Sequence, residues 1–380
     1  MAIRSEETPS GKIVRRDEAS GEIRGTVSRE GKDDIPTPSE PNKARGETAK
    51  TPENYTLRLS PVETINLIKS HSLSTDSLKA FARSKDLGVR MAILDSPKVT
   101  QEILDYLVSS SKKEEYRLRL TVARRYDLST LTMARLASDS IPAVRAQMAR
   151  HLNLNEGSQN DLSYDPDPLV RANLASNKKA NAKVLEHLAQ DREPSVQVAV
   201  AGNEKTSPDI LFSMQVVYGH TSLTLITAIA GNPNASMNTL ETLSQYSDVS
   251  VRAAVAFNVS TPDEVLDALS KDTSAESLPV MRALVANPRL PKDALHNLLK
   301  VSDPKIQEHI ALHRNSDSAI LDSLTSVAEN EYIIELLCER PNISVETLKK
   351  LVEDKSIRIS PFIRNRANEY LEYRLYGESN

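Results

Sequence analysis

Several residue types are rare in this 380-residue chain, and their rarity excludes some classes of site. It contains one cysteine, Cys338, and no tryptophan, and 4% of its residues are aromatic. A single cysteine excludes an internal disulfide framework, a zinc site built from cysteines and an iron–sulfur cluster held by four thiolates. Cys338 follows a segment, residues 333–337, that is apolar except for Glu335, which favours a small core residue over a nucleophile.

Neither sign of charge dominates, and long apolar runs are missing. Lys plus Arg total 48 against 52 for Asp plus Glu, a formal charge of −4. This balance argues against a general polyanion binder, whose affinity comes from many cations that displace counterions. No run reaches the roughly 18 apolar residues of a membrane span, and the N-terminus lacks the apolar core of a signal peptide. We therefore expect a soluble cytoplasmic protein without a membrane partner.

Motifs for catalysis or cofactor binding are also missing. The sequence has no glycine-rich phosphate loop, nucleophile elbow or paired carboxylates. His309 and His313 lie four residues apart, on one face of a predicted helix, but no third metal ligand accompanies them. His313 and His151 occupy a position that other parts of the chain give to Asn. We expect no enzyme activity, no cofactor and no metal.

Residues 1–54 differ in composition from the rest of the chain. They hold five of the eleven glycines, five prolines and no aromatic residue, among mixed charges. Such a stretch buries too little apolar surface to offset the entropy lost on ordering, so it is predicted to be a disordered arm. Ile13-Val14 and Ile23 could anchor a docking motif in it, or the arm needs no partner.

From Tyr55 onward the chain repeats itself. A pattern such as Val144-Arg145-Ala146-Gln147 recurs, and we call its second residue the index position. The index positions are Arg90, Arg119, Arg145, Arg171, Gln197, Ile226, Arg252, Met281, Gln307 and Ile334, with a fainter copy at Ile65. Successive index positions are 26, 27 or 29 residues apart, which makes about eleven units over residues 55–360.

Each unit reads as two short helices. The first ends about six residues past the index position, often at Asn, which tolerates the left-handed backbone that closes a helix. A capping Ser or Thr, as in Ser207-Pro208-Asp209, then starts a second helix with apolar residues three or four apart. Pairs this small cannot bury their own apolar stripe. The sequence therefore predicts an all-α, right-handed superhelical solenoid, behind the arm and closed by a capping helix and tail at 361–380.

These residues resemble known helical repeats over about 300 of the 380 residues. An acid six positions before an arginine, as in Asp139…Arg145 and Asp165…Arg171, resembles the HEAT-repeat pattern. Val-Arg, then Asn-Pro, then Leu-x-x-Leu resembles the bacterial leucine-rich variant repeat, which stacks an α-helix with a shorter, often 3₁₀, helix. The iron–sulfur cluster of that family's founding members cannot form here, because Cys338 stands alone. The resemblance implies an architecture and leaves function open.

The charged residues at and before the index positions have two interpretations. They form either a cationic strip for phosphate or an acidic peptide, or a structural ladder of ion pairs between successive units. A fixed register, with Asp preceding the arginine, favours the ladder, and apolar index residues would interrupt a strip. The predicted ladder residues are Arg90, Arg119, Asp139, Arg145, Asp165, Arg171 and Arg252.

Two places depart from the repeat and are candidate binding segments. In residues 152–167 the second helix should carry Leu near 159 but has Gln159, two residues after Gly157. We expect a frayed helix or a loop here, containing Asn155 and Gln159, which acts as a hinge, a docking loop or a degenerate unit. In residues 361–376 aromatic and arginine side chains gather, either as a capping helix or as a partner patch of the type found at interfaces. The patch consists of Tyr370, Tyr373, Tyr376, Arg366 and Arg374.

The leading functional hypothesis is a non-enzymatic scaffold that binds a protein or peptide over the extended surface of its repeats. The alternative is a nucleic-acid-binding repeat protein, which requires basic residues of successive units to line one groove. An enzyme with a cleft in the array is the third hypothesis, and no motif supports it. The sequence sets neither the oligomeric state nor the face that binds.

Overall fold

The computed structural model divides the chain into two compact units, Met1–Arg58 and Leu59–Asn380. In the first unit it describes the backbone of residues 3–7, 13–17 and 23–27. In the second it describes residues 59–110, 112–272, 274–328, 330–354 and 359–377.

The first unit corrects the prediction of an arm without regular structure. Strands β1 (Ile3–Glu7), β2 (Ile13–Asp17) and β3 (Ile23–Val27) form an antiparallel sheet in the order β1-β2-β3. Ile3 is paired with Asp17, and Ile13 with Val27. Ile and Val, which favour extended backbone, recur about every ten residues between Gly- and Ser-containing stretches, and composition alone does not show this spacing. The other residues of 1–54 lie outside the described part of the chain.

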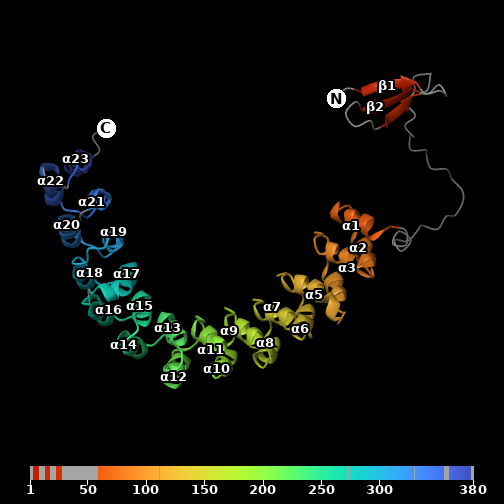
Figure 1. Cartoon of the computed structure of the whole chain (residues 1–380), viewed down its shortest axis with the longest axis horizontal. Coiled ribbons are helices and arrows are strands. Elements are labelled where there is room, and N and C mark those ends of the chain that lie inside the picture. The colour runs from red at the N-terminus through yellow and green to blue at the C-terminus, as the bar shows by residue number, and fades with distance from the viewer. Residues whose placement is uncertain are drawn as a thin grey trace. The chain divides into compact units, whose positions relative to one another are not determined.

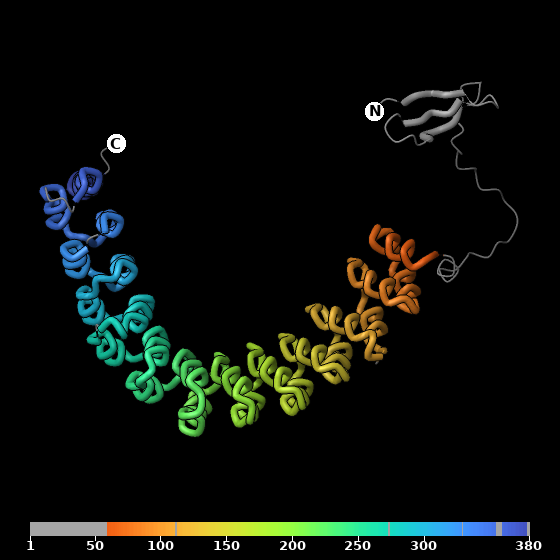
Figure 2. Tube along the Cα trace, viewed as in Figure 1, coloured from red at the N-terminus to blue at the C-terminus, as the bar shows by residue number. Residues whose placement is uncertain are grey.

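The second unit is the predicted helical solenoid. Successive helix pairs stack into an arc, with the first helix of each pair on its inner side and the second on its outer side (Figures 1 and 2). The inner helices are α1 (Pro61–Lys69), α3 (Leu87–Ile93), α5 (Tyr116–Ala123), α7 (Pro142–Ala149), α9 (Pro168–Ala175), α11 (Pro194–Ala201), α13 (Leu223–Gly231), α15 (Val249–Phe257), α17 (Leu278–Ala286), α19 (Pro304–Leu312) and α21 (Glu331–Cys338). The outer helices are α2 (Thr75–Ala82), α4 (Gln101–Leu107), α6 (Thr130–Ala137), α8 (Glu156–Ser163), α10 (Ala182–Leu188), α12 (Pro208–Tyr218), α14 (Met237–Ser244), α16 (Asp263–Ser270), α18 (Lys292–Leu298), α20 (Ser318–Val327) and α22 (Val345–Glu353). Helix α23 (Pro361–Tyr376) closes the array.

Local sequence explains where the helices begin. Outer helices begin after capping hydroxyls or amides, as at Ser207, which accepts from the N–H of Ile210, and inner helices begin with proline, as at Pro168. Both rows are α-helical. The shorter 3₁₀ helices that the resemblance implies occur, within the described residues, only as η2 (Lys113–Glu115) and η3 (Ala275–Ser277).

One continuous core runs between the two rows. Inner helices contribute pairs such as Val170 and Leu174, and outer helices contribute pairs such as Leu185 and Leu188, all with exposed fractions of 0%. Cys338 is buried in this core, and its burial raises the pKa of the thiol to about 12. Because each pair rests on its neighbours, the whole array shares its interior.

Three units are three residues longer than the 26-residue spacing. In two of them the extra residues form η2 and η3, between the outer helix and the next inner helix. In the third, the extra residues lengthen α12 itself, which has 11 residues where α10 has 7 and α14 has 8. The same insertion is thus a short connecting helix twice and an added turn of an outer helix once.

Candidate partner-binding surface

The arginines at the index positions form ion pairs between neighbouring units. Arg145 donates from Nε and Nη2 to the two carboxylate oxygens of Asp165, at 2.6 and 2.8 Å, and from Nη1 to the backbone oxygen of Asp139, at 2.8 Å. The acid six positions before one arginine therefore binds that arginine through its backbone and the preceding unit's arginine through its carboxylate. This two-pronged geometry is the strong form of an arginine–carboxylate contact.

The same contact recurs along the N-terminal half. Arg119 pairs with Asp139, Arg171 pairs with Asp191, and Arg90 pairs with Glu115. Arg119 is 2% exposed, so it is not available to a ligand. The Arg90 guanidinium, by hydrogen bonding to Glu115, lowers the pKa of that carboxyl to about 2.

The ladder stops in the middle of the array. Gln197 keeps only the backbone contact, to the oxygen of Asp191 at 2.7 Å, and Ile226 is buried and apolar. Arg252 binds the backbone oxygens of Tyr246 and Ser247, at 2.8 and 2.7 Å, and pairs with no carboxylate among the described residues. The structure thus brings together the predicted ladder residues from Arg90 to Arg171. Arg252, which was also predicted, lies outside the ladder.

A second ladder, of asparagines, was missed by the sequence analysis. Asn203 is buried, and its Nδ2 donates to the backbone oxygens of Ala175 and Asn177, at 2.5 and 3.0 Å, in the preceding unit. Its Oδ1 accepts from the N–H of Lys205 at 2.8 Å. The same set of contacts is made by Asn177, Asn232, Asn258 and Asn287.

These asparagines correct the prediction that Asn ends a helix through left-handed backbone. Asn232 and Asn258 have φ of −75° and −67°, and among described non-glycine residues only His71 has a positive φ. The side chain rather than the backbone explains the choice, because its amide has both a donor and an acceptor for buried backbone groups. The recurrence of Asn itself was the signal.

The two histidines in this position make two of the three asparagine contacts. The Nδ1 of His313 accepts from the N–H of Asn315 at 3.1 Å, and its Nε2 lies 2.9 Å from the oxygen of Asn287. His151 contacts Asn153 and Arg125 in the same way. His309, in contrast, is exposed, and the described residues contain no cluster of three or more side chains that would hold a metal ion.

Residues 152–167 are neither frayed nor a loop, which corrects the prediction for this segment. Helix α8 is complete, and Asn155 is its N-cap, accepting from the N–H of Ser158 at 2.8 Å. Gln159 is 4% exposed, so it cannot contact a partner. It donates to the oxygens of Leu154 and Lys179 and accepts from the N–H of Asn181. A polar side chain fits in place of Leu because unpaired backbone groups meet it there.

The C-terminal aromatic and arginine residues divide into two groups. Arg366 contacts Glu335 and Glu339, its guanidinium carbon lies 5.4 Å from the Tyr370 ring centroid, and the Tyr370 hydroxyl donates to Glu339. Arg374 donates to the backbone oxygens of Ile343 and Arg340. These three residues fasten α23 to the array. Tyr373 and Tyr376 are 57% and 75% exposed, so they alone of the predicted patch face solvent.

The central inner helices α9, α11, α13 and α15 contain no exposed charged residue, although Arg252 of α15 is half-exposed. Its exposed residues in α9, α11, α13 and α15 are Leu169, Pro194, Ser195, Leu223, Thr224, Gly231, Ser250 and Phe257. A shallow cavity of about 410 Å³ crosses α11, α13 and α15 and is lined in part by Val198, Leu223 and Ala228. Other inner helices do expose charge, as α5 does at Arg117 and α17 does at Arg282. The signal of the central surface in the sequence is the lack of charge at the exposed positions counted from each index position.

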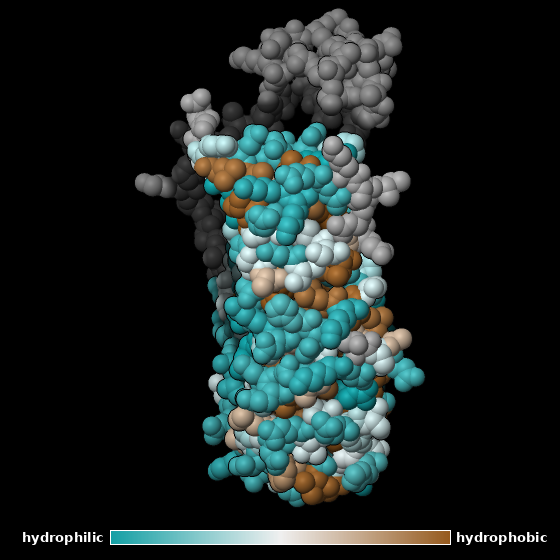
Figure 3. Space-filling view, turned by 90° about the vertical axis from the view of Figure 1, so that its left-hand side faces the viewer, coloured by the Kyte–Doolittle hydropathy of each residue, from teal (hydrophilic) through white to brown (hydrophobic). Residues whose placement is uncertain are grey.

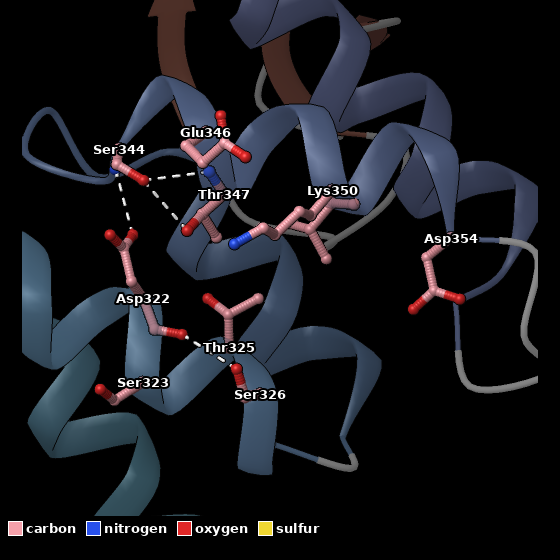
Figure 4. A pocket seen from close by; sticks show the side chains of 10 residues that line it. Asp322, Ser323, Thr325, Ser326, Ser344, Glu346, Thr347, Lys350 and Asp354 are labelled. Atoms are coloured by element: carbon pink, nitrogen blue, oxygen red, sulfur yellow. Dashed lines mark hydrogen bonds between the residues drawn. The ribbon is translucent and has the colours of Figure 1, made fainter.

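A larger, polar cavity of about 590 Å³ lies between α20 and α22 on the outer side (Figure 4). Ser344 caps α22 by accepting from the N–H of Thr347 at 3.0 Å, and its own N–H donates to Asp322 at 3.2 Å. The amine of Lys350 points into the cavity. Its hydroxyls cap and connect helices, and neither histidine nor cysteine lines it.

Comparisons with known proteins give matches among solved structures. No family model and no curated protein matches the chain. One similar solved structure is described as a leucine-rich repeat variant with a novel repetitive structural motif. It is 17% identical, covers 73% of this chain and 88% of its own, and has a TM-score of 0.36. An engineered protein is 18% identical, covers 63% and 95%, and has a TM-score of 0.21. The first belongs to the repeat class that the sequence pattern resembles. At these TM-scores neither likeness carries an argument.

Within the described residues, no helix combines the length and apolar character that crossing a membrane requires.

Proposed function

We propose that this chain is a non-enzymatic, cytoplasmic scaffold of the leucine-rich variant or HEAT-like type, which binds a protein or peptide segment along its inner surface. The inner surface of α9, α11, α13 and α15, without an exposed charged residue, carries the proposal. Leu169, Leu223 and Phe257 are 59%, 46% and 60% exposed on it. Burial of such side chains stabilises a complex, while burial of charges opposes it.

The same surface disfavours the alternative, nucleic-acid binding. A phosphate backbone needs a row of cations, and the central inner helices offer only the half-exposed Arg252. The index arginines do not supply them, because Arg119, Arg145 and Arg171 are engaged in the ladder. The observation in favour of nucleic acid is local: Arg117 is exposed on α5, and Arg124 and Arg150 are exposed directly after α5 and α7.

Adding charge to the inner surface tests the proposal. The double variant Thr224→Glu, Ser250→Glu changes two exposed inner side chains, and Thr242→Glu, Gln245→Glu is the matched control on the outer helix α14. Proteins cross-linked to each variant in cell extract are compared with those of the unaltered protein. We expect the inner variant to lose its partners and the control to keep them, with equal melting temperatures and no effect of nuclease. Equal capture by both variants, or capture that nuclease abolishes, contradicts the proposal.

A further inference from the structure

Helix α12 is unlike the other outer helices in what it exposes. Phe212, Val216 and Val217 are 44%, 62% and 63% exposed on its outward side. The corresponding side of α10 exposes Lys183, Glu186 and other polar groups. Figure 3 shows the C-terminal side of the array, where hydrophilic residues dominate and apolar ones form small patches. Of the outer helices α2 to α22, only α12 exposes three large apolar side chains in the described residues.

The added turn explains where this surface comes from. Val216 and Val217 belong to the part of α12 that extends beyond the length of its neighbours. Core packing does not require these residues, because both are mostly exposed and the other two long units place their extra residues in η2 and η3. Tyr218, in the same turn, packs against the core, but the exposed Val216 and Val217 cost solubility unless something covers them.

A cavity of about 440 Å³ lies beside this turn, between α10 and α12. Its apolar lining comes from Ala189, Ile210, Met214, Val217 and Tyr218. This volume suits one or two large apolar side chains of an incoming segment.

Two carboxylates, those of Glu186 and Asp209, also line this cavity. Neither forms an ion pair with any residue in the described part of the chain. Asp209 lies in the first turn of α12, where the helix dipole favours a negative charge. Glu186 does not lie in the first turn of its helix, so the helix dipole does not explain its charge. An apolar cavity bordered by two uncompensated negative charges is complementary to an apolar side chain next to a cation.

We propose that the outer surface between α10 and α12 binds a helical segment of a partner protein in which apolar residues three or four apart are flanked by Lys or Arg. Its apolar side chains enter the cavity and cover Phe212, Val216 and Val217, and its cations contact Glu186 and Asp209. This goes beyond the proposed function, because the site lies on the opposite side of the helix pairs from the inner surface. It gives the scaffold a second, independent binding surface.

A defined peptide tests this site on the full chain. The probe is a fluorescein-labelled amphipathic Leu/Lys helix of about 14 residues, with Leu at positions i, i+3, i+4 and i+7. Its affinity is measured by fluorescence anisotropy at about 0.15 M salt. A Leu/Glu peptide with the same apolar pattern and a Ser/Lys peptide with the same charge are the ligand controls. We expect the Leu/Lys peptide to bind at least tenfold more tightly than either control.

Protein variants locate the binding. We expect Val217→Ser to weaken binding about tenfold or more, and Glu186→Gln with Asp209→Asn to weaken it severalfold and reduce its salt dependence. The matched controls on α14 are Met237→Ser, which removes another apolar side chain that is 62% exposed, and Glu241→Gln. Both should bind as the unaltered protein does. Circular dichroism and melting temperature show that each variant is folded.

Three results overturn the proposal. The first is equal binding of the Leu/Lys and Ser/Lys peptides. The second is unchanged affinity in folded Val217→Ser protein. The third is dimerisation that Val217→Ser abolishes, measured by light scattering, which would assign the surface to a second copy of the chain. The inner variant Thr224→Glu, Ser250→Glu should bind the peptide normally. Failure of this site therefore leaves the inner-surface proposal standing, and the reverse also holds.

Discussion

At the scale of single residues, the array depends on side chains that bind backbone groups of the neighbouring unit. Asn203 and its counterparts pair buried carbonyls that would otherwise face an apolar interior, and such unpaired groups are costly. Imidazole replaces the amide at His313 because Nδ1 accepts where Oδ1 does and Nε2 donates where Nδ2 does. One requirement, a donor and an acceptor a fixed distance apart, is met by two residue types.

The ladder arginines should matter for stability far more than exposed ones. Arg145→Gln leaves the buried carboxylate of Asp165 without its partner, so we expect a loss of about 2–4 kcal/mol in the free energy of unfolding. Arg150→Gln, an exposed arginine that follows the same helix α7, should change it by less than about 0.5 kcal/mol. Urea unfolding followed by circular dichroism measures both. Equal losses would show that the ion pair is not a stabilising element.

Stability should depend on pH through His313. Burial lowers the pKa of His313 from its ordinary value of 6.5, and the hydrogen bond to the Asn287 oxygen opposes this shift. The unfolded chain therefore binds the proton more readily. The contribution of neutral His313 to the free energy of unfolding is complete above pH 6.5 and is lost as the pH falls toward the lowered pKa. Protonation would also set an N–H of Nδ1 against the N–H of Asn315.

The variant His313→Asn should remove this dependence. The variant has, at the end of α19, the same residue type that other units have at Asn287 and its counterparts. The fold should therefore persist at neutral pH. Between pH 7.5 and 5.5 we expect the free energy of unfolding of the unaltered protein to fall by on the order of 1 kcal/mol more than that of the variant. Urea unfolding at the two pH values measures the difference, and parallel losses in both proteins would contradict the assignment.

At the scale of elements, buried polar groups decided between a loop and a helix. Helix α8 has poor apolar content, yet it is capped by Asn155 and joined to the next unit by Gln159. Gly157 is tolerated because it lies in the first turn, where α8 faces solvent. Apolar periodicity alone underestimates a helix whose interior contact is a hydrogen bond.

Gln159→Ala should therefore destabilise α8 and its contact with α10. Asn181 would lose the acceptor of its N–H, and an unpaired buried group costs about 1–3 kcal/mol. Asn160→Ala, one residue further on the exposed side of α8, is the control and should have little effect. Hydrogen exchange of the α8 amides detects the change locally. Unchanged exchange in Gln159→Ala would contradict this role of Gln159 and would favour the interpretation of the segment as a degenerate unit.

At the scale of the whole solenoid, stability belongs to the stack and not to any one pair of helices. Residues such as Val170 and Leu185 are buried only because pairs on both sides cover them. Helix α23 closes the last of these surfaces with Ile363, Ala367 and Leu371, and Arg366 and Arg374 fasten it.

Removal of residues 359–380 should accordingly expose the apolar side of α21 and α22. We expect a lower melting temperature and concentration-dependent association. The control is the full chain with the exposed Tyr373 and Tyr376 changed to Ser, which should show neither effect. Differential scanning calorimetry and light scattering at several concentrations provide the comparison. A truncated protein as stable and as soluble as the full chain would show that α23 is not a cap.

The sequence by itself determined the repeat, the helix pairs and their register, because apolar spacing and capping residues are local signals repeated about eleven times. It also favoured Arg145 and Asp165 as ladder partners, since a fixed register points to a structural role. Only the tertiary structure decided that Asn203 binds the neighbouring unit, that Gln159 is interior, and that Val217 is exposed beside two carboxylates. Each of these depends on which residues of adjacent units meet, and the distance between units in space is not encoded in any single unit.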